Sequence, residues 1–270
     1  MTDHTDPRTT LLVPTDDSDI EVVLEGSGPL VVLLPSLGRE SYDYGDVAEG
    51  LAAKGFSVAR PQPRGIGRSV GPTEDITLHD LADDVRAVIE FLGAPEAIVV
   101  GHAFGHYVAR TLAADRPDLV RGVVVAAGGA RDYPVELTEI AVKCADSSLP
   151  DDERCALLNT AFFAPGNDPT GWLDGWYPDV SRSQLAAAAA TPKDQWWDIA
   201  RQPILDLQAE LDPFRPRDTA EELRDRFGDV VSVSVVPNAR HALLPEAPDR
   251  VVHEIATWIR NVVRIRPMKD

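Results

Sequence analysis

The segment that most restricts the fold of this chain is residues 98–110, which reads IVVGHAFGHYVAR. Three β-branched residues come first, Gly101-His102-Ala103-Phe104-Gly105 follows, and a helical pattern comes after it. Two glycines four residues apart permit a sharp turn and a close approach of neighbouring backbone, which a Cβ atom would obstruct. The pattern therefore predicts a buried strand, a tight turn and a helix, in that order.

Strand and helix patterns alternate on both sides of this turn. Continuous apolar runs at residues 30–34 and 97–100 are typical of strands buried on both faces, as in a parallel sheet. The other expected strands are residues 20–25, 56–59, 122–127, 204–208 and 230–236, and the expected helices are residues 42–54, 78–92, 104–115, 219–227 and 248–263. This order predicts an α/β fold with a mostly parallel central sheet flanked by helices. The residues before position 20 are interpreted as a polar leader.

The strand pattern is interrupted once, between residues 132 and 201. Helical pieces, an alanine run and paired tryptophans occupy this stretch. We therefore expect residues 1–131 and 202–270 to form the core domain and residues 132–201 to form a helical cap inserted over the sheet. Trp172 and Trp176 are candidates for the apolar, aromatic lining of a pocket under this cap.

Composition excludes several classes of function. The 44 acidic residues outnumber the 26 basic residues, so the chain lacks the positive charge that nucleic-acid binding requires. No run of 18 apolar residues occurs and no apolar segment follows the first residues, so neither a membrane span nor secretion is expected. Cys144 and Cys155 have no metal-ligand spacing and suit a reducing cytoplasm. The expected partner is a small-molecule substrate, with no metal and no cofactor; the choice between a monomer and a homodimer stays open.

The turn at residues 101–105 resembles the nucleophile elbow, G-x-S-x-G, of the α/β-hydrolase superfamily, and the resemblance extends over nearly the whole chain. A dinucleotide-binding turn would need G-x-G-x-x-G, which is absent. The resemblance implies the chain order nucleophile, acid, histidine. It assigns the nucleophile position to Ala103, the acid to Asp212 and the histidine to His241, each after an expected strand. Asp132 is an alternative acid, although a helix cap is its simpler role.

The resemblance also implies an oxyanion hole beside the elbow. One donor would be the backbone N–H of Phe104, and the second, we expect, the backbone N–H of Leu37, in the loop after the first buried strand. Ser36 stands in that loop where the family commonly has a different residue. His106 follows the elbow closely and is expected either to contact substrate or water or to pack in the interior. His102 is expected to be structural.

Alanine at position 103 has no nucleophilic atom, so an acyl-enzyme cannot form there. Three explanations are open: a serine replaced by substitution, a natural enzyme in which the His241–Asp212 dyad acts as a general base, or a non-catalytic ligand-binding or sensor protein. The preserved dyad favours catalysis, and the expected activity is hydrolysis of a small, largely apolar ester or lactone. A lyase or a cofactor-independent oxygenase is a further alternative.

Overall fold

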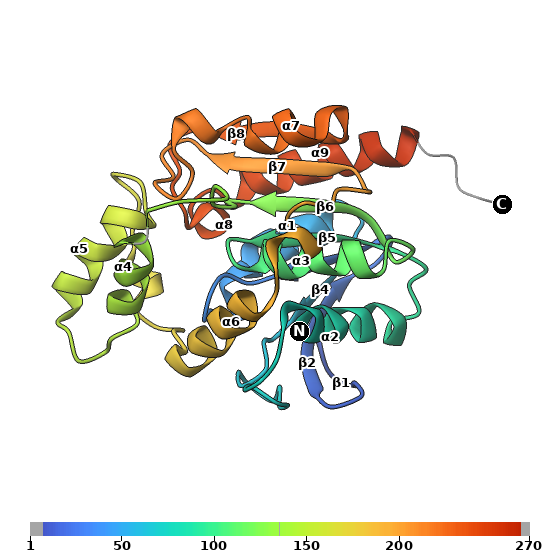
Figure 1. Cartoon of the computed structure of the whole chain (residues 1–270), viewed down its shortest axis with the longest axis horizontal. Helices are drawn as coiled ribbons and strands as arrows, with labels where there is room; N and C mark the ends of the chain where they lie inside the picture. The colour runs from blue at the N-terminus through green and yellow to red at the C-terminus, as the bar shows by residue number, and fades with distance from the viewer. Residues whose placement is uncertain (1–7, 135, 266–270) are drawn as a thin grey trace, which may run out of the picture.

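The computed structural model describes residues 8–134 and 136–265, with side chains described as far as residue 262. Its centre is a sheet with the strand order β1-β2-β4-β3-β5-β6-β7-β8 (Figure 1). The strands are β1 Thr9–Pro14, β2 Asp19–Gly26, β3 Leu30–Leu34, β4 Ser57–Pro61, β5 Ala97–His102, β6 Val120–Ala126, β7 Ile204–Ala209 and β8 Val231–Val236. β1 and β2 are antiparallel to their neighbours, and the other neighbouring pairs are parallel. The expected α/β-hydrolase fold class is confirmed.

One strand was not expected. β1 lies within the stretch interpreted as a polar leader and pairs antiparallel with β2 at the edge of the sheet. Burial alternates only weakly along β1, where Val13 alone is fully buried. A strand at the edge of a sheet needs little apolar surface. The polar-leader interpretation was therefore wrong for Thr9–Pro14.

Helices cover both faces of the sheet, as parallel strands require. Along β3, Val31 and Leu33 pack on one face, against α1 and α9, whereas Val32 packs on the other, against α2 and α3. The helical elements of the core are η1 Ser41–Tyr44, α1 Gly45–Ala53, α2 Leu78–Phe91, α3 Gly105–Asp115, η4 Arg217–Thr219, α7 Glu222–Phe227, η5 Gly228–Val230, α8 Leu243–Glu246 and α9 Pro248–Ile265. The apolar runs in the sequence are continuous because each strand is buried on both sides.

Helical segments fill the chain between β6 and β7. They are α4 Glu136–Cys144, α5 Asp151–Ala161, η2 Thr170–Trp172, α6 Pro178–Ala190 and η3 Lys193–Gln195. Figure 1 shows α4 and α5 beyond the carboxyl ends of β6 and β7, and α6 crossing in front of the sheet. A third apolar cluster holds this region together through Phe162, Phe163 and Trp172, and it also includes Phe214 from the core. These segments therefore stand over the edge of the sheet where a site is expected.

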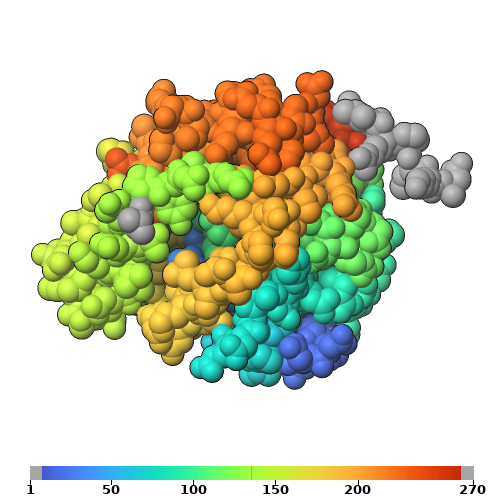
Figure 2. Space-filling model, in the orientation of Figure 1, coloured from blue at the N-terminus to red at the C-terminus, as the bar shows by residue number. Residues whose placement is uncertain are grey.

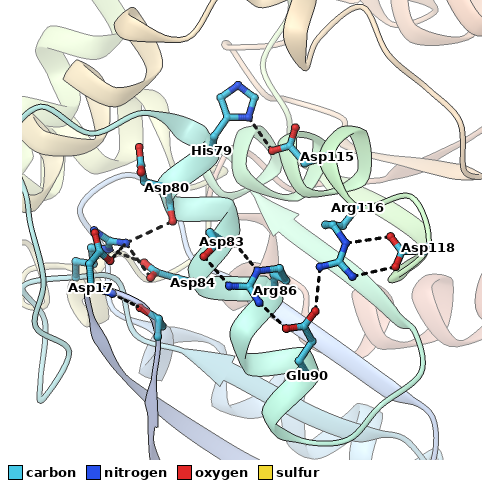
Figure 3. Close-up of polar contacts among 12 residues, drawn as sticks. Asp17, His79, Asp80, Asp83, Asp84, Arg86, Glu90, Asp115, Arg116 and Asp118 are labelled. Carbon is cyan, nitrogen blue, oxygen red and sulfur yellow. Dashed lines mark hydrogen bonds and ion pairs between the residues drawn. The ribbon is translucent and has the colours of Figure 1, made fainter.

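Ion pairs join α2 to α3 on the molecular surface (Figure 3). Arg86 pairs with Asp83 and Glu90 on its own helix, and Arg116 bridges Glu90 to Asp118 at 2.9 Å on each side. These side chains are partly exposed to solvent, so each pair contributes little to stability. Within the described residues we find no helix that is long and apolar enough to cross a membrane.

Candidate active site

The turn between β5 and α3 adopts the sharp conformation that the sequence predicts. Ala103 has a φ of 46° and its N–H donates to the carbonyl of Ala126 at the end of β6, at 2.9 Å. A Cβ atom on Gly101 would lie 2.3 Å from the backbone nitrogen of His106, and one on Gly105 would lie 2.5 Å from the carbonyl oxygen of Leu34. Both glycines are therefore required by close backbone contacts.

The backbone at position 103 is strained although the side chain is only a methyl group. Residues with a Cβ atom lose about 1–2 kcal/mol in the left-handed region. Ala127, which follows β6, has a similar φ of 45°. Strained residues of this kind concentrate at functional sites, where the surrounding structure maintains them. The turn thus keeps the conformation that presents residue 103 at the carboxyl end of the sheet.

Asp212 and His241 come together from two loops that follow β7 and β8. Nδ1 of His241 lies 2.9 Å from Oδ2 and 3.1 Å from Oδ1 of Asp212, and both residues are buried. The Phe214 N–H donates to Oδ1 of Asp212 at 2.9 Å, and the Phe214 ring stacks on the His241 ring with centroids 3.9 Å apart. The carboxylate orients the imidazole with Nδ1 as the protonated nitrogen, which leaves Nε2 as a base.

Asp132, the alternative acid, lies elsewhere. Its carboxylate is 89% exposed and faces Lys193 Nζ at 3.4 Å. An exposed carboxylate paired with a lysine is not positioned to orient His241, whose Nδ1 already faces Asp212. The structure therefore brings Asp212, not Asp132, to the histidine.

His102, the residue before Ala103, is fully buried and connects three loops. Its Nε2 lies 2.6 Å from the carbonyl oxygen of His241, and its Nδ1 lies 2.8 Å from Oη of Tyr44. Because a carbonyl only accepts, Nε2 carries the proton and Nδ1 accepts from the Tyr44 hydroxyl. The Tyr44 oxygen in turn accepts the Ser36 N–H at 3.0 Å. Burial lowers the pKa of His102 to about 3, so the ring stays neutral in this chain.

Ser36 does not offer its N–H as an oxyanion donor, because that N–H donates to the Tyr44 hydroxyl oxygen. The residue nevertheless lines the cavity described below. The next residue, Leu37, lines the same cavity, as does Phe104. The two backbone groups that the sequence suggests as oxyanion donors thus belong to residues that border one cavity.

His106 is buried against the elbow. Its Nδ1 donates to the carbonyl oxygen of Ala103 at 2.5 Å, so the proton resides on Nδ1, and Nε2 has no hydrogen-bond partner among the described residues. Burial, together with the positive charge of Arg110, lowers the pKa of His106 well below its ordinary value. His106 also borders the cavity. His106 is therefore packed in the interior, as one of the two expectations stated, and its contact with substrate or water stays a prediction.

A cavity lies over Ala103. Figure 2 shows a hollow between the yellow-green α4–α5 region and the gold α6, with blue and teal atoms at its floor. The residues that line the cavity come from both the core and the inserted helices: Ser36, Leu37, Ala103, Phe104, His106, Tyr107, Gly129, Tyr133, Thr138, Ala141, Phe162, Trp176, Leu185, Phe214 and His241. None of these side chains carries a permanent charge, so the cavity suits a neutral, largely apolar molecule.

The tryptophans divide between the cavity and the interior. Trp176 borders the cavity, whereas Trp172 does not and instead packs against His102 and Phe162. Trp196 and Trp197 are buried in the core cluster that includes α2 and α3. The expectation of an aromatic lining therefore fits Trp176. Trp172 lies outside the lining, in contact with His102 and Phe162.

Arg39 was not suggested by the sequence, yet it joins the loop after β3 to the inserted helices. Its guanidinium contacts the rings of both Trp172 and Trp176, 4.4 Å and 4.6 Å from their centroids, and pairs with Asp43 at 2.7 Å. The neighbouring Gly38 N–H donates to Oε1 of Gln184 on α6 at 2.8 Å. No local pattern marks the contacts with the tryptophans and Gln184, because these partners are distant in sequence. The loop that carries Leu37 is thus held by the inserted segment.

The described residues contain no cluster of three side chains that could hold a metal ion. The groups that the site brings together include His241, the buried carboxylate of Asp212, and backbone N–H groups. This combination can take a proton from a bound molecule or from water and can stabilise a negative charge that develops on an oxygen atom.

Comparison with known proteins supports the fold. A family model described as alpha/beta hydrolase fold matches residues 29–153. Among curated proteins, the chain is 33% identical over 146 residues to a soluble epoxide hydrolase of Corynebacterium sp. (strain C12), covering 54% of this chain and 46% of that protein. It is 36% identical over 100 residues to 2-(acetamidomethylene)succinate hydrolase of Mesorhizobium japonicum, covering 37% of this chain and 36% of that protein. The matched region thus spans less than half of the length of these two relatives.

Solved structures extend the likeness to the whole fold. A thermophilic esterase from Thermogutta terrifontis superposes with a TM-score of 0.75 at 23% identity, covering 94% of this chain and 98% of that one. The structure of E-2-(acetamidomethylene)succinate hydrolase gives a TM-score of 0.76 at 24% identity, covering 94% of this chain and 99% of that one. At this level of identity the structures establish a shared fold.

Proposed function

Since the chain is a member of the α/β-hydrolase superfamily, we propose that it hydrolyses a neutral, largely apolar ester or lactone, with His241 as the general base. The observation that carries this proposal is the buried Asp212–His241 pair, of which His241 borders the same cavity as the strained residue Ala103. A protein that only bound a ligand would have no chemical need for a buried carboxylate oriented against an imidazole.

In the proposed mechanism water replaces the missing nucleophile. His241 Nε2 accepts a proton from a water molecule as that water attacks the substrate carbonyl carbon. The negative charge that forms on the carbonyl oxygen is stabilised by the backbone N–H groups of Phe104 and Leu37. His241 then returns the proton to the leaving oxygen, and Asp212 stabilises the imidazolium in between. The methyl group of Ala103 leaves room for the water.

Such a reaction is slower than the two-step reaction of a serine enzyme. A general base contributes about 10²–10⁴-fold, whereas no covalent intermediate is available at Ala103. The proposal therefore favours activated substrates, such as aryl esters and strained lactones. The relatives named as an epoxide hydrolase and an esterase support hydrolysis as the class of reaction.

A panel of aryl esters and lactones, assayed with the purified protein in ¹⁸O-labelled water, tests the proposal. We expect turnover with one ¹⁸O atom in the acid product, and a loss of about 100-fold or more in the His241→Gln and Asp212→Asn variants. Product formation without ¹⁸O would instead indicate a lyase or an oxygenase. Turnover that is unchanged in His241→Gln would contradict the proposal.

The Ala103→Ser variant separates the explanations for the alanine. If serine is the residue this site is built for, the variant becomes the faster enzyme and reacts covalently with a fluorophosphonate at position 103. If the site uses water directly, the serine displaces that water, and wild-type turnover exceeds that of the variant. Activity in neither protein would contradict hydrolysis by this site.

The absence of a nucleophile at Ala103 favours a second candidate, a ligand-binding or sensor protein on the same fold. In that case the cavity would bind an apolar ligand without changing it. Its affinity would then be the same in the wild type and in His241→Gln, and no product would form on prolonged incubation.

A further inference from the structure

A second hollow lies next to the cavity over Ala103. It is a groove between α4 and α6, and we call it the α4–α6 groove. It is lined by Leu37, Ala141, Val142, Ala145, Trp176, Pro178, Ser181, Arg182 and Leu185. Most of these side chains are apolar. The side chains of Ala141, Ala145 and Ser181 are small.

The groove adjoins the cavity that His241 borders. Four residues line both spaces: Leu37, Ala141, Trp176 and Leu185. The two spaces therefore share a wall made of these side chains. A molecule bound over Ala103 that reached the groove would pass this wall and not the packed core.

The outer part of the groove exposes apolar side chains to solvent. Val142 on α4 is 60% exposed and Leu185 on α6 is 36% exposed. The one charged group in the lining, Arg182, pairs with Asp179. Its charge is therefore compensated, and the groove has no unpaired charge that would select an ionic ligand.

We propose that the α4–α6 groove binds an unbranched alkyl chain of the substrate. The substrate class is then a fatty ester or an alkyl-substituted lactone, with the carbonyl at Ala103 and the chain directed between α4 and α6. This inference rests on the proposed function of the cavity, because it assigns the reacting end of the substrate to His241. The wall that the groove shares with the cavity favours the substrate chain, rather than a protein partner, as the occupant.

A series of n-alkyl methyl ketones, from butanone to dodecan-2-one, tests the groove without any reaction, because a ketone cannot be hydrolysed. Calorimetry measures the dissociation constant of each ketone for the full chain. Each buried methylene should tighten binding by about fourfold, as burial of a methylene stabilises by about 0.8 kcal/mol. In the wild type this gain should continue through the longer ketones.

Two substitutions in the groove should end that gain. Ala145 and Val142 line the groove but not the cavity, so Ala145→Trp fills the groove and Val142→Asp places a charge in it. Both variants should bind the short ketones with the affinity of the wild type. In each variant the long ketones should bind no more tightly than the ketones of intermediate length. Thr160→Asp, on the exposed face of α5 and outside the groove, is the matched control and should retain the full series.

The outcomes separate the groove from the reaction. The groove proposal would be overturned if the affinity of the wild type stopped rising at the short ketones. It would also be overturned if both groove variants bound the long ketones as tightly as the wild type does. A parallel assay with p-nitrophenyl esters of increasing length reports on hydrolysis independently. If the ketone series behaves as expected while no ester is cleaved, the groove binds alkyl chains and the proposed hydrolysis fails.

Discussion

His102 Nε2 donates a hydrogen bond to the carbonyl oxygen of His241 at 2.6 Å, and this contact ties the elbow directly to the loop of the proposed base. The other nitrogen of the same ring accepts from Tyr44, whose oxygen accepts the Ser36 N–H. The three loops that surround Ala103 are therefore joined by one directional chain of hydrogen bonds.

Removing the middle of this chain should weaken both the fold and the site. Tyr44→Phe leaves the Ser36 N–H and His102 Nδ1 without their partner in a buried position, which costs about 1–3 kcal/mol per buried group. We expect a corresponding decrease in the free energy of urea unfolding. Tyr42→Phe, at a half-exposed tyrosine two residues earlier, removes one hydrogen bond to Glu21 and is the comparison; it should have a smaller effect. Equal stability of the two variants would show that the chain contributes nothing.

The close contacts of Gly105 predict a large effect of adding one methyl group. A Cβ atom there meets the carbonyl oxygens of Leu34 and Pro35 at 2.5 Å and 2.7 Å, so Gly105→Ala forces the elbow away from β3. Overpacking of this kind typically costs about 1–3 kcal/mol. Thermal unfolding should show a lower Tm for Gly105→Ala. Gly171→Ala, where nothing lies within 4 Å of the added atom, should leave the Tm nearly unchanged.

The strain at Ala103 predicts an unusual effect of glycine. Glycine tolerates a φ of 46° without penalty, so Ala103→Gly should maintain or increase the free energy of unfolding, by up to about 1 kcal/mol. Ala126→Gly, within β6, is the matched change in a regular strand. It should lower the free energy of unfolding by about 0.5–1 kcal/mol or more. Equal losses in both variants would argue against strain at position 103.

The burial of His106 predicts lower stability in acid. Burial and the charge of Arg110 keep this imidazole neutral in the folded chain, whereas in the unfolded chain it binds a proton below its ordinary pKa of 6.5. The unfolded state then holds more protons, so the free energy of unfolding falls as the pH is lowered below 6.5. This one group contributes at most about 1.4 kcal/mol per pH unit.

The His106→Asn variant isolates this contribution, because the amide can still donate toward the Ala103 carbonyl but does not titrate. Urea unfolding of both proteins between about pH 7.5 and about pH 5 should give a shallower pH dependence for the variant. Parallel curves for the two proteins would mean that His106 does not contribute to the acid sensitivity.

Much of the fold follows from local patterns in the sequence. Buried strands were predicted at β3 and β5 because continuous apolar runs suit parallel strands, and the elbow was predicted because Gly101 and Gly105 permit its close contacts. β1 was missed because an edge strand carries a weak apolar signal. The roles of Asp212 and His241 remain predictions, although the structure brings the two side chains into contact.

By itself the sequence determined the strand–turn–helix at Ala103 and the alternation of strands and helices, since these depend on side-chain period and on where a Cβ atom fits. Only the tertiary structure decided which groups meet around that turn. The contact of His102 with His241 spans 139 positions, and that of His102 with Tyr44 spans 58. Such contacts depend on strand order and on the paths of loops, which no local pattern encodes. For the same reason, the contacts of Arg39 with Trp172 and Trp176 and the groove between α4 and α6 emerged only from the assembled fold.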